Sequence, residues 1–220
     1  MSPLQTVPRG NGPSFVRHAG IAAPFLLPNV DTDIIAPLSP RTISGLSDGE
    51  RAFEPIRYLS DGSENPDFVL NQEPYRNASI LLAGDNFGTG SSRGTGVSLP
   101  MAFGIRVVIA SSFGPIFYSN SIRQGMLAVT LGEEVIAGLA DWAGSNPGVE
   151  MLVDLERNVI EAPGLRPISF SIDARVRNKF LLGLSTLDEM LQHSEGVRSL
   201  RNEDRNRRPW IYANGTGANR

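Results

Sequence analysis

The stretch GDNFGTGSSRGTG, residues 84–96, lies between two apolar segments and decides how the chain is organised. Before it, ASILLAG at 78–84 predicts a short buried strand. After it, TGVSLPMAFG at 95–104 predicts a short helix, and Gly104 suits its C-terminal turn. A strand, a glycine-rich turn and a helix in this order are typical of an α/β domain.

The residue types of this stretch predict an anion site. Its five glycines allow close approach of a ligand to backbone N–H groups, and the start of the following helix adds partial positive charge. Ser91 and Ser92 add hydroxyl donors, and Arg93 adds a planar fork that suits a carboxylate or a phosphate. A structural turn without a ligand is the alternative that the composition leaves open.

Two nucleotide-binding patterns do not fit the loop. A phosphate-binding P-loop needs a lysine that is absent here. The dinucleotide pattern GxGxxG begins at Gly88 but meets Arg93 where its last glycine belongs, and no acidic residue follows about 20 residues later.

The same strand and helix alternation continues on both sides of the loop. The opening segment 14–27 predicts a strand or a strand pair, and antiparallel segments at both ends argue against a plain doubly wound sheet. The other predicted elements are strands at 106–110 and 126–131, helices at 113–125 and 133–144, a weak helix and polar loop within 41–77, a strand hairpin within 149–172 that turns at Arg157-Asn158, and a helix at 174–194 broken near Gly183.

Composition excludes several classes of function. The net charge of -3 lacks the basic field of a nucleic-acid binder, and no apolar run reaches the roughly 18 to 20 residues of a membrane span. The first residues show no signal pattern, so we expect a cytoplasmic protein. The chain has no cysteine, and its two histidines, His18 and His193, lie far apart without a supporting motif. We therefore expect no metal and no cysteine-ligated cluster on this chain.

Several segments together resemble a known family. They are NVDTDIIAP at 29–37, NPDFVLN at 65–71, ASILLAGDNFGTGSSR at 78–93, FGIRVVIASSFGPIFYSNSIRQGML at 103–127 and FSIDARVRNKFLLGL at 170–184. In this order they resemble the small subunit of 3-isopropylmalate dehydratase, which is similar to the swivelling C-terminal domain of aconitases. The resemblance implies an α/β fold with three β/β/α layers over residues 14–200. The residues outside this range predict a flexible arm at 1–13 and a charged, disordered tail at 201–220.

The resemblance also implies a function. Small subunits of this type act with a large subunit as a hydro-lyase that isomerises 2-isopropylmalate and 3-isopropylmalate in leucine biosynthesis by dehydration and rehydration. The large subunit carries a [4Fe-4S] cluster and binds the small 2-hydroxy dicarboxylate, so the cysteine-free chain is expected to hold no cofactor, and neither nucleic acid nor membrane is an expected partner. Two alternatives are a paralogous subunit for another diacid, of homoaconitate, citramalate or dimethylmalate type, and a non-catalytic interaction subunit.

Roles for individual residues follow from the same resemblance. Ser91 matches the serine that acts as general base, and Ser92, Arg93 and Gly90 match the residues that hold a substrate carboxylate. Further candidates lie in matching segments, where each also has a structural interpretation such as helix capping or packing: Asp31, Thr32 and Asp33 of the DTD turn, Asn120, and Arg41 and Arg57 of the segment that recognises the substrate side chain.

The chain departs from the family directly after the arginine. The family loop usually reads GCGSSREHA, whereas this loop reads GTGSSRGTG, so Gly94 and Thr95 stand where a Glu-His pair is usual. The change removes charge and adds backbone freedom next to the proposed carboxylate-binding residue. It leaves the identity of the diacid open.

Overall fold

The computed structural model describes residues 14–38, 45–90, 93–192 and 194–212. Ser91, Ser92, Arg41 and His193 of the sequence analysis lie outside these residues, as does the predicted arm at 1–13. All structural statements below concern the described part of the chain.

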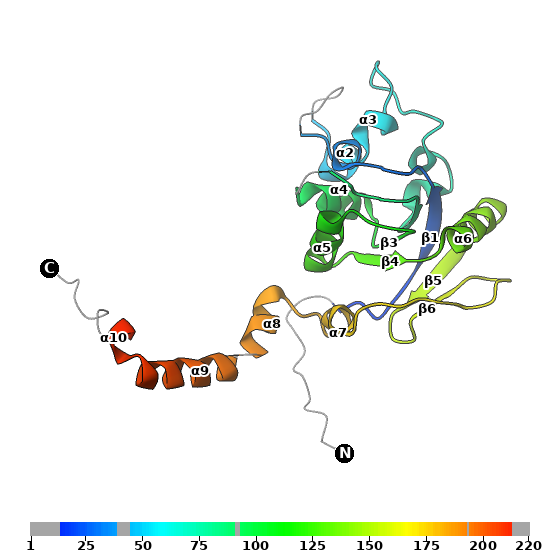
Figure 1. Cartoon of the computed structure of the whole chain (residues 1–220). Helices are drawn as coiled ribbons and strands as arrows, with labels where there is room; N and C mark the ends of the chain where they lie inside the picture. The colour runs from blue at the N-terminus through cyan, green and yellow to red at the C-terminus, as the bar shows by residue number, and fades with distance from the viewer. Residues whose placement is uncertain (1–13, 39–44, 91–92, 193, 213–220) are drawn as a thin grey trace.

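One mixed sheet of seven strands organises the molecule (Figure 1). Its strands lie in the order β4-β3-β2-β1-β5-β6-β7. Four strands are parallel: β1 (Arg17–Phe25), β2 (Ile80–Ala83), β3 (Val107–Ala110) and β4 (Leu127–Thr130). Three continue antiparallel beyond β1: β5 (Glu150–Asp154), β6 (Val159–Glu161) and β7 (Ile168–Ser169). The predicted departure from a doubly wound sheet is therefore confirmed.

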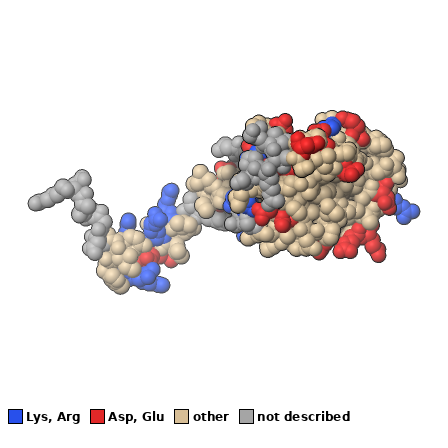
Figure 2. Space-filling view, turned by 90° about the horizontal axis from the view of Figure 1, so that it is seen from above, with Lys and Arg blue, Asp and Glu red and all other residues tan. Residues whose placement is uncertain are grey.

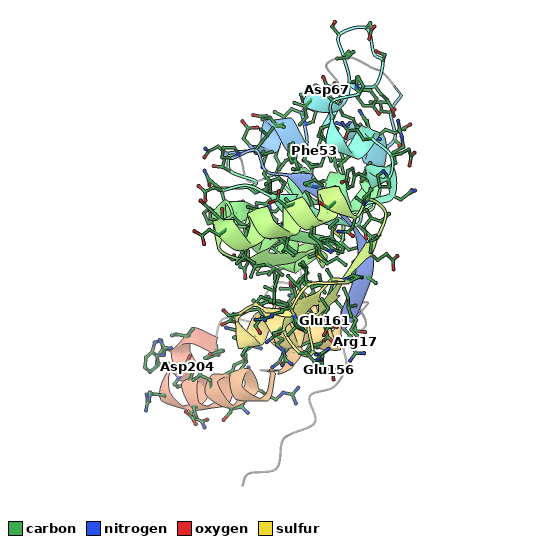
Figure 3. All side chains as sticks on the ribbon, turned by 90° about the vertical axis from the view of Figure 1, so that its right-hand side faces the viewer. Arg17, Phe53, Asp67, Glu156, Glu161 and Asp204 are labelled. Carbon is green, nitrogen blue, oxygen red and sulfur yellow. The ribbon has the colours of Figure 1, made fainter. Side chains whose placement is uncertain are left out.

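The long strand β1 joins the parallel and antiparallel halves of the sheet. Its residues 22–25 pair with β2, and its residues 17–21 pair with β5. An ion pair of 2.9 Å between Arg17 Nε and the buried Asp154 Oδ2 connects β1 to the end of β5, near the Arg17 label in Figure 3. The segment 14–27, for which the sequence predicted a strand or a strand pair, therefore forms a single strand.

Side chains of the parallel strands alternate between two cores. In β2, Leu81 and Ala83 pack on one face of the sheet, and Ile80 and Leu82 pack on the other. The first face is covered by the helices α1 (Thr32–Ile35), α2 (Asp48–Arg51), α3 (Glu54–Arg57), α4 (Thr95–Phe103) and α5 (Pro115–Gln124) and by the 3-10 turns η1 (Val69–Asn71) and η2 (Tyr75–Asn77). The second face is covered by α6 (Glu133–Ser145) and α7 (Ala174–Leu182). The layers match the predicted α/β class.

The weak helix predicted within 41–77 is interrupted. Phe53 adopts a left-handed backbone with φ 59° and separates α2 from α3. Its buried ring, labelled in Figure 3, packs edge-on against Phe25 at 5.6 Å between centroids. Tertiary packing of this ring therefore decides where the local helix ends. The predicted turn at Arg157-Asn158 is confirmed, and Asn158 takes φ 54° there.

The C-terminal residues are helical. Gly183, with φ 63°, ends α7 where the sequence predicted a break. Beyond it follow α8 (Thr186–Gln192), α9 (Ser194–Arg207) and α10 (Pro209–Tyr212), which extend away from the body in Figure 1. Helix α9 crosses the boundary at residue 200 that separated domain from tail in the sequence analysis, and that division stays a prediction. No helix in the described ranges has the length and apolar character that crossing a membrane requires.

Candidate functional site

The glycine-rich loop lies at the carboxyl edge of the parallel strands. It follows β2, and the segments after β1 and β3 flank it because parallel strands end at the same edge of a sheet. In open α/β sheets this edge is where ligands usually bind. The strand order thus places the loop at the edge where ligands of such sheets usually bind.

Backbone hydrogen bonds fix the loop to the segment after β1. The Gly88 N–H donates to the Val30 carbonyl at 2.8 Å, and the Thr32 N–H donates to the Thr89 carbonyl at 2.8 Å. Asp31 and Thr89 also form an isolated parallel bridge. These bonds bring the DTD turn against the glycine loop, although the two segments are far apart in sequence.

The other side of the loop is fixed to the segment after β3. The Phe87 N–H donates to the Ser112 carbonyl at 3.1 Å, and the Gly114 N–H donates to the Phe87 carbonyl at 2.9 Å. At Gly88 the backbone has φ +74°, and a Cβ there would lie 2.2 Å from Phe117 Cγ. Glycine at this position is therefore required by both backbone and space.

The DTD turn supplies a helix cap and a wall of the loop. Asp31 Oδ1 accepts the N–H groups of Asp33, at 2.9 Å, and Ile34, at 2.8 Å, which caps α1. Thr32 is buried, and a Cβ on Gly90 would lie 3.1 Å from its Oγ1. The capping interpretation of Asp31 is thus observed, and the same turn closes around Gly90.

Arg93 and Asp33 form an ion pair at the rim of the loop. Arg93 Nη2 donates to Asp33 Oδ1, and Arg93 Nη1 donates to the Ala36 carbonyl at 3.5 Å. The Arg93 side chain is 19% exposed, whereas that of Asp33 is 57% exposed. The guanidinium is therefore held from one side by the DTD turn. The sequence analysis named both residues but did not predict that they pair, because no local pattern relates them.

Helix α5 supplies a contact that sequence reasoning missed. Gln124 Nε2 donates to the Gly94 carbonyl at 2.9 Å, directly after Arg93. Asn120, one of the further candidates of the sequence analysis, is buried on the same helix, and its Oδ1 accepts from Arg123 Nη2 at 2.6 Å. The position of Gln124, one residue before the predicted helix end at Gly125, offered no signal for this role.

Replacing Gln124 with alanine should lower the free energy of unfolding by about 1 kcal/mol. The Gly94 carbonyl would lose a side-chain donor in a partly buried place. Urea denaturation of the two proteins measures the change. Gln72→Ala is a matched control, because the Gln72 Nε2 also donates to a backbone carbonyl, that of Pro66 at 2.9 Å, but does so at an exposed position. Equal losses in the two variants would show that the α5 contact has no special weight.

Arg57, another arginine of the sequence analysis, contacts the α2–α3 segment and the 3-10 turn η1. Arg57 is buried, and its Nε donates to Asn71 Oδ1 at 3.2 Å while its Nη1 donates to the Gly49 carbonyl at 2.9 Å. Its guanidinium thus braces the α2–α3 segment. Arg41 lies outside the described residues, as do the two serines of the loop.

No cluster of three or more metal-ligating side chains occurs in the described ranges. His18 pairs with Ser79, with 2.7 Å between Nε2 and Oγ. Burial, and then the charge of Arg106, lower the pKa of His18 below the ordinary value of a histidine. His18 is therefore a half-buried residue that is hydrogen-bonded to a neighbouring strand segment.

Comparison with known proteins identifies the family. The family model of the aconitase C-terminal domain matches residues 13–134. The 3-isopropylmalate dehydratase small subunit of Agrobacterium fabrum is 41% identical over 197 residues, which are 89% of this chain and 98% of that protein. The chain belongs to the family of 3-isopropylmalate dehydratase small subunits. The family prediction from sequence is confirmed, and the enzyme class of this family is a hydro-lyase.

Other relatives in the small-subunit family agree. The small subunit of Marinobacter nauticus is 38% identical over 212 residues, or 92% of this chain and 99% of that protein. A crystal structure of 3-isopropylmalate dehydratase from Methanocaldococcus jannaschii has a TM-score of 0.55 and 24% identity, and the match covers 84% of this chain and 99% of that one. This likeness shows the fold, which is the swivelling-domain fold expected from the sequence.

Proposed function

We propose that this chain is the small subunit of a 3-isopropylmalate dehydratase-type hydro-lyase and that it closes over the substrate. The enzyme isomerises 2-isopropylmalate and 3-isopropylmalate in leucine biosynthesis. The observation that carries the proposal is the placement of Arg93 beside the DTD turn at the carboxyl edge of the sheet. A family of small subunits implies a large subunit as partner. We expect the assembly in the cytoplasm and its ligand to be a small 2-hydroxy dicarboxylate.

The iron–sulfur cluster of this enzyme class does not fit this chain. A [4Fe-4S] cluster needs cysteine thiolates, and the sequence contains none. We therefore assign the cluster to the large subunit, where it would supply a Lewis-acidic iron for the substrate. The task left to the small subunit is to bind a carboxylate and to move a proton.

Arg93 and Ser92 are proposed to bind a substrate carboxylate. A guanidinium presents parallel N–H donors that match the two carboxylate oxygens. Asp33 holds Nη2 from one side, and the Ala36 carbonyl accepts from Nη1, so the fork is oriented before a ligand arrives. Gly90, with φ +104°, lets the loop backbone approach the same ligand without a side chain.

Ser91 is proposed to accept the proton that leaves carbon. The C–H bond breaks as hydroxide leaves the adjacent carbon and a C=C bond forms, and the proton rests on Ser91 Oγ. In the rehydration half, the proton is delivered to the carbon that lost hydroxide, and hydroxide adds to the carbon that lost the proton. Serine is a poor base at its usual pKa, so the alkoxide needs stabilisation. The neighbouring N–H groups of the glycine loop and the charge of Arg93 are proposed to stabilise the alkoxide electrostatically, as the donors of an oxyanion hole stabilise an oxyanion.

A second candidate is a paralogous subunit for another 2-hydroxy diacid. The observation that favours it is Gly94-Thr95 in place of the usual Glu-His pair. In the structure, Gly94 has φ -63° and is the N-cap residue of α4, and its carbonyl accepts from Gln124 Nε2. A Cβ at this position would lie 3.3 Å from Gln124 Nε2, so another residue there requires this side chain to shift, but the backbone itself does not impose glycine.

Reconstitution with a cluster-loaded large subunit tests the proposal. We expect neither chain alone to act on 3-isopropylmalate and the pair to produce the unsaturated intermediate, which is followed by its ultraviolet absorbance. Homoaconitate, citramalate and dimethylmalate in parallel reactions identify a paralogue. Activity of this chain alone, or a pair that binds but turns over none of these diacids, would contradict the proposed function.

A further inference from the structure

The C-terminal arm, defined as residues 186–212 with helices α8 to α10, holds most of the large apolar side chains that are more than half exposed in the described residues. Elsewhere in the described residues, only Leu27 and Leu38 are more than half exposed. In the arm, seven large apolar side chains exceed that value: Leu187, Met190, Leu191, Val197, Leu200, Trp210 and Ile211. Such a concentration marks a surface that another molecule covers.

Local interactions give the arm its shape without covering its apolar side chains. Ser185 and Asp188 cap α8 reciprocally, at 2.8 and 3.1 Å, and Lys179 Nζ pairs with Glu189 at 2.5 Å, which fastens α8 to α7. Farther along, Asp204 accepts from Arg208 Nε at 2.6 Å and from Tyr212 Oη at 2.8 Å, which folds α10 back on α9. Because isolated helices of this length are marginally stable in water, the arm gains from a partner surface.

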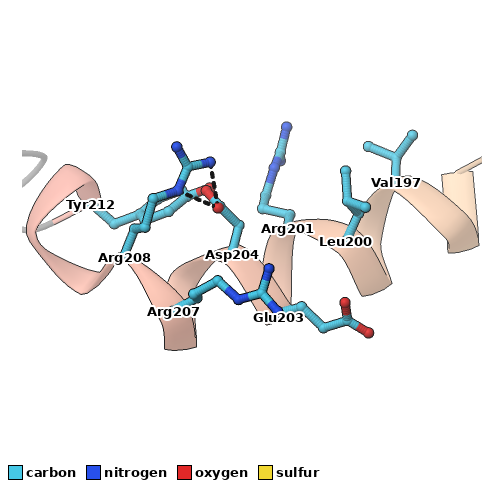
Figure 4. A pocket seen from close by; sticks show the side chains of 8 residues that line it. All are labelled: Val197, Leu200, Arg201, Glu203, Asp204, Arg207, Arg208 and Tyr212. Carbon is cyan, nitrogen blue, oxygen red and sulfur yellow. Dashed lines mark hydrogen bonds and ion pairs between the residues drawn. The ribbon is translucent and has the colours of Figure 1, made fainter.

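The fold between α9 and α10 forms a hollow of about 400 Å³ (Figure 4). Val197 and Leu200 supply its apolar part. Arg201, Arg207 and Arg208 surround it, together with Glu203, Asp204 and Tyr212. Residues 194–212 contain five arginines and three acidic residues, although the whole chain has a net charge of -3. Figure 2 shows the blue side chains gathered on this projecting part.

This chemistry fits a protein surface better than a lipid surface. A helix that lies in a membrane interface needs a continuous apolar face. Helix α9 has two large apolar side chains in 14 residues, and its acidic Asp204 lies on the same hollow as Val197 and Leu200. The complementary surface is therefore apolar at its centre and carries carboxylates at its rim.

We infer that the C-terminal arm docks on the large subunit of the same enzyme and tethers the small subunit to it. The inference rests on the proposed function. Alignments with small subunits span 89% and 92% of this chain, more than residues 1–185 could supply, so part of the arm belongs to the chain these proteins share. The exposed apolar surface and the arginines of the arm describe what such a partner must offer.

The arm leaves the body away from the site. Phe180 of α7, just before the arm, packs in the core on one face of the sheet. Phe117, which supports Gly88 of the loop, packs in the core on the other face. A tether at one face lets the loop approach and leave a bound diacid without dissociation, because the second contact is then intramolecular.

The test compares the full chain with a Trp210→Ala/Ile211→Ala variant in binding to the large subunit, measured by calorimetry without substrate. We expect the Kd to rise about 30-fold, the effect of losing a buried aromatic anchor, while kcat at saturating small subunit stays unchanged. Leu165→Ala, which removes a partly exposed leucine from the β6–β7 segment, is the matched control with an unchanged Kd. An unchanged Kd in the arm variant would overturn the inference.

A second variant keeps the apolar side chains and reverses charge. Arg198→Glu/Arg201→Glu should also weaken binding, and its effect should shrink with added salt. Circular dichroism establishes that each variant is folded. The arm could instead bind a second copy of this chain or a membrane. Concentration-dependent self-association of the chain alone would overturn the inference if the arm variants abolish it, and so would arm-dependent binding to vesicles that contain anionic lipid. An arm-dependent Kd with no turnover by the wild-type pair would support the tether and contradict only the proposed function.

Discussion

Turnover of the reconstituted enzyme should fall about 100- to 1,000-fold when Arg93 is replaced by lysine. Lysine keeps the charge but is a point donor, so it cannot present the planar fork to a carboxylate. It also cannot keep both bonds that the guanidinium makes, to Asp33 Oδ1 and to the Ala36 carbonyl, and a substituted side chain would be less well oriented. Steady-state kcat and KM with saturating large subunit measure the loss.

The matched control for this result is Arg157→Lys. Arg157 pairs with Glu161 at 2.8 Å in the β5–β6 hairpin and is half exposed, so lysine there should leave turnover unchanged. Both variants should bind the large subunit as the wild type does, because neither residue belongs to the arm. Unchanged turnover in Arg93→Lys would show that Arg93 does not bind the substrate.

The fold should be most sensitive to Gly88→Ala, which we expect to lower the free energy of unfolding by about 3 kcal/mol. The backbone at Gly88 has φ +74°, and its new Cβ would lie 2.2 Å from Phe117 Cγ. The Phe117 ring has little room to move, since it packs edge-on against Phe87 at 5.3 Å and stacks with Phe113 at 6.1 Å. Backbone strain of about 1–3 kcal/mol and crowding of similar size act together.

Gly125→Ala separates the two contributions. Gly125 ends α5 with φ +87°, but a Cβ there would meet no atom within 4 Å. Its alanine variant should therefore show the backbone strain alone, about 1 kcal/mol. Urea denaturation gives both values. If the two variants lose the same stability, the contact between Gly88 and Phe117 contributes nothing, and the loop has more room than its neighbours indicate.

Local sequence patterns predicted many elements of the fold correctly. The apolar runs at 78–84 and 106–110, separated by a glycine-rich turn and a helical segment, specified buried strands with a crossover, because side chains of a strand buried on both faces are continuously apolar. Gly183 and the turn at Arg157-Asn158 ended their elements as expected, since both need a left-handed backbone. The helix predicted within 41–77 forms in two pieces, α2 and α3, because the packing of the Phe53 ring interrupts it.

By itself, then, the sequence determined the α/β class and the cysteine-free chemistry, because these depend on residue type and on spacing along the chain. The family, and with it the residues of the proposed site, followed from resemblance to known sequences. Tertiary structure alone decided that β1 pairs with β2 on one side and β5 on the other. It also decided that Arg93 meets Asp33 across 60 residues, that Gln124 meets Gly94 across 30, and that the arm is left uncovered. The reason is physical: such contacts form only where the packed chain brings distant donors and acceptors together, and no local pattern encodes that distance.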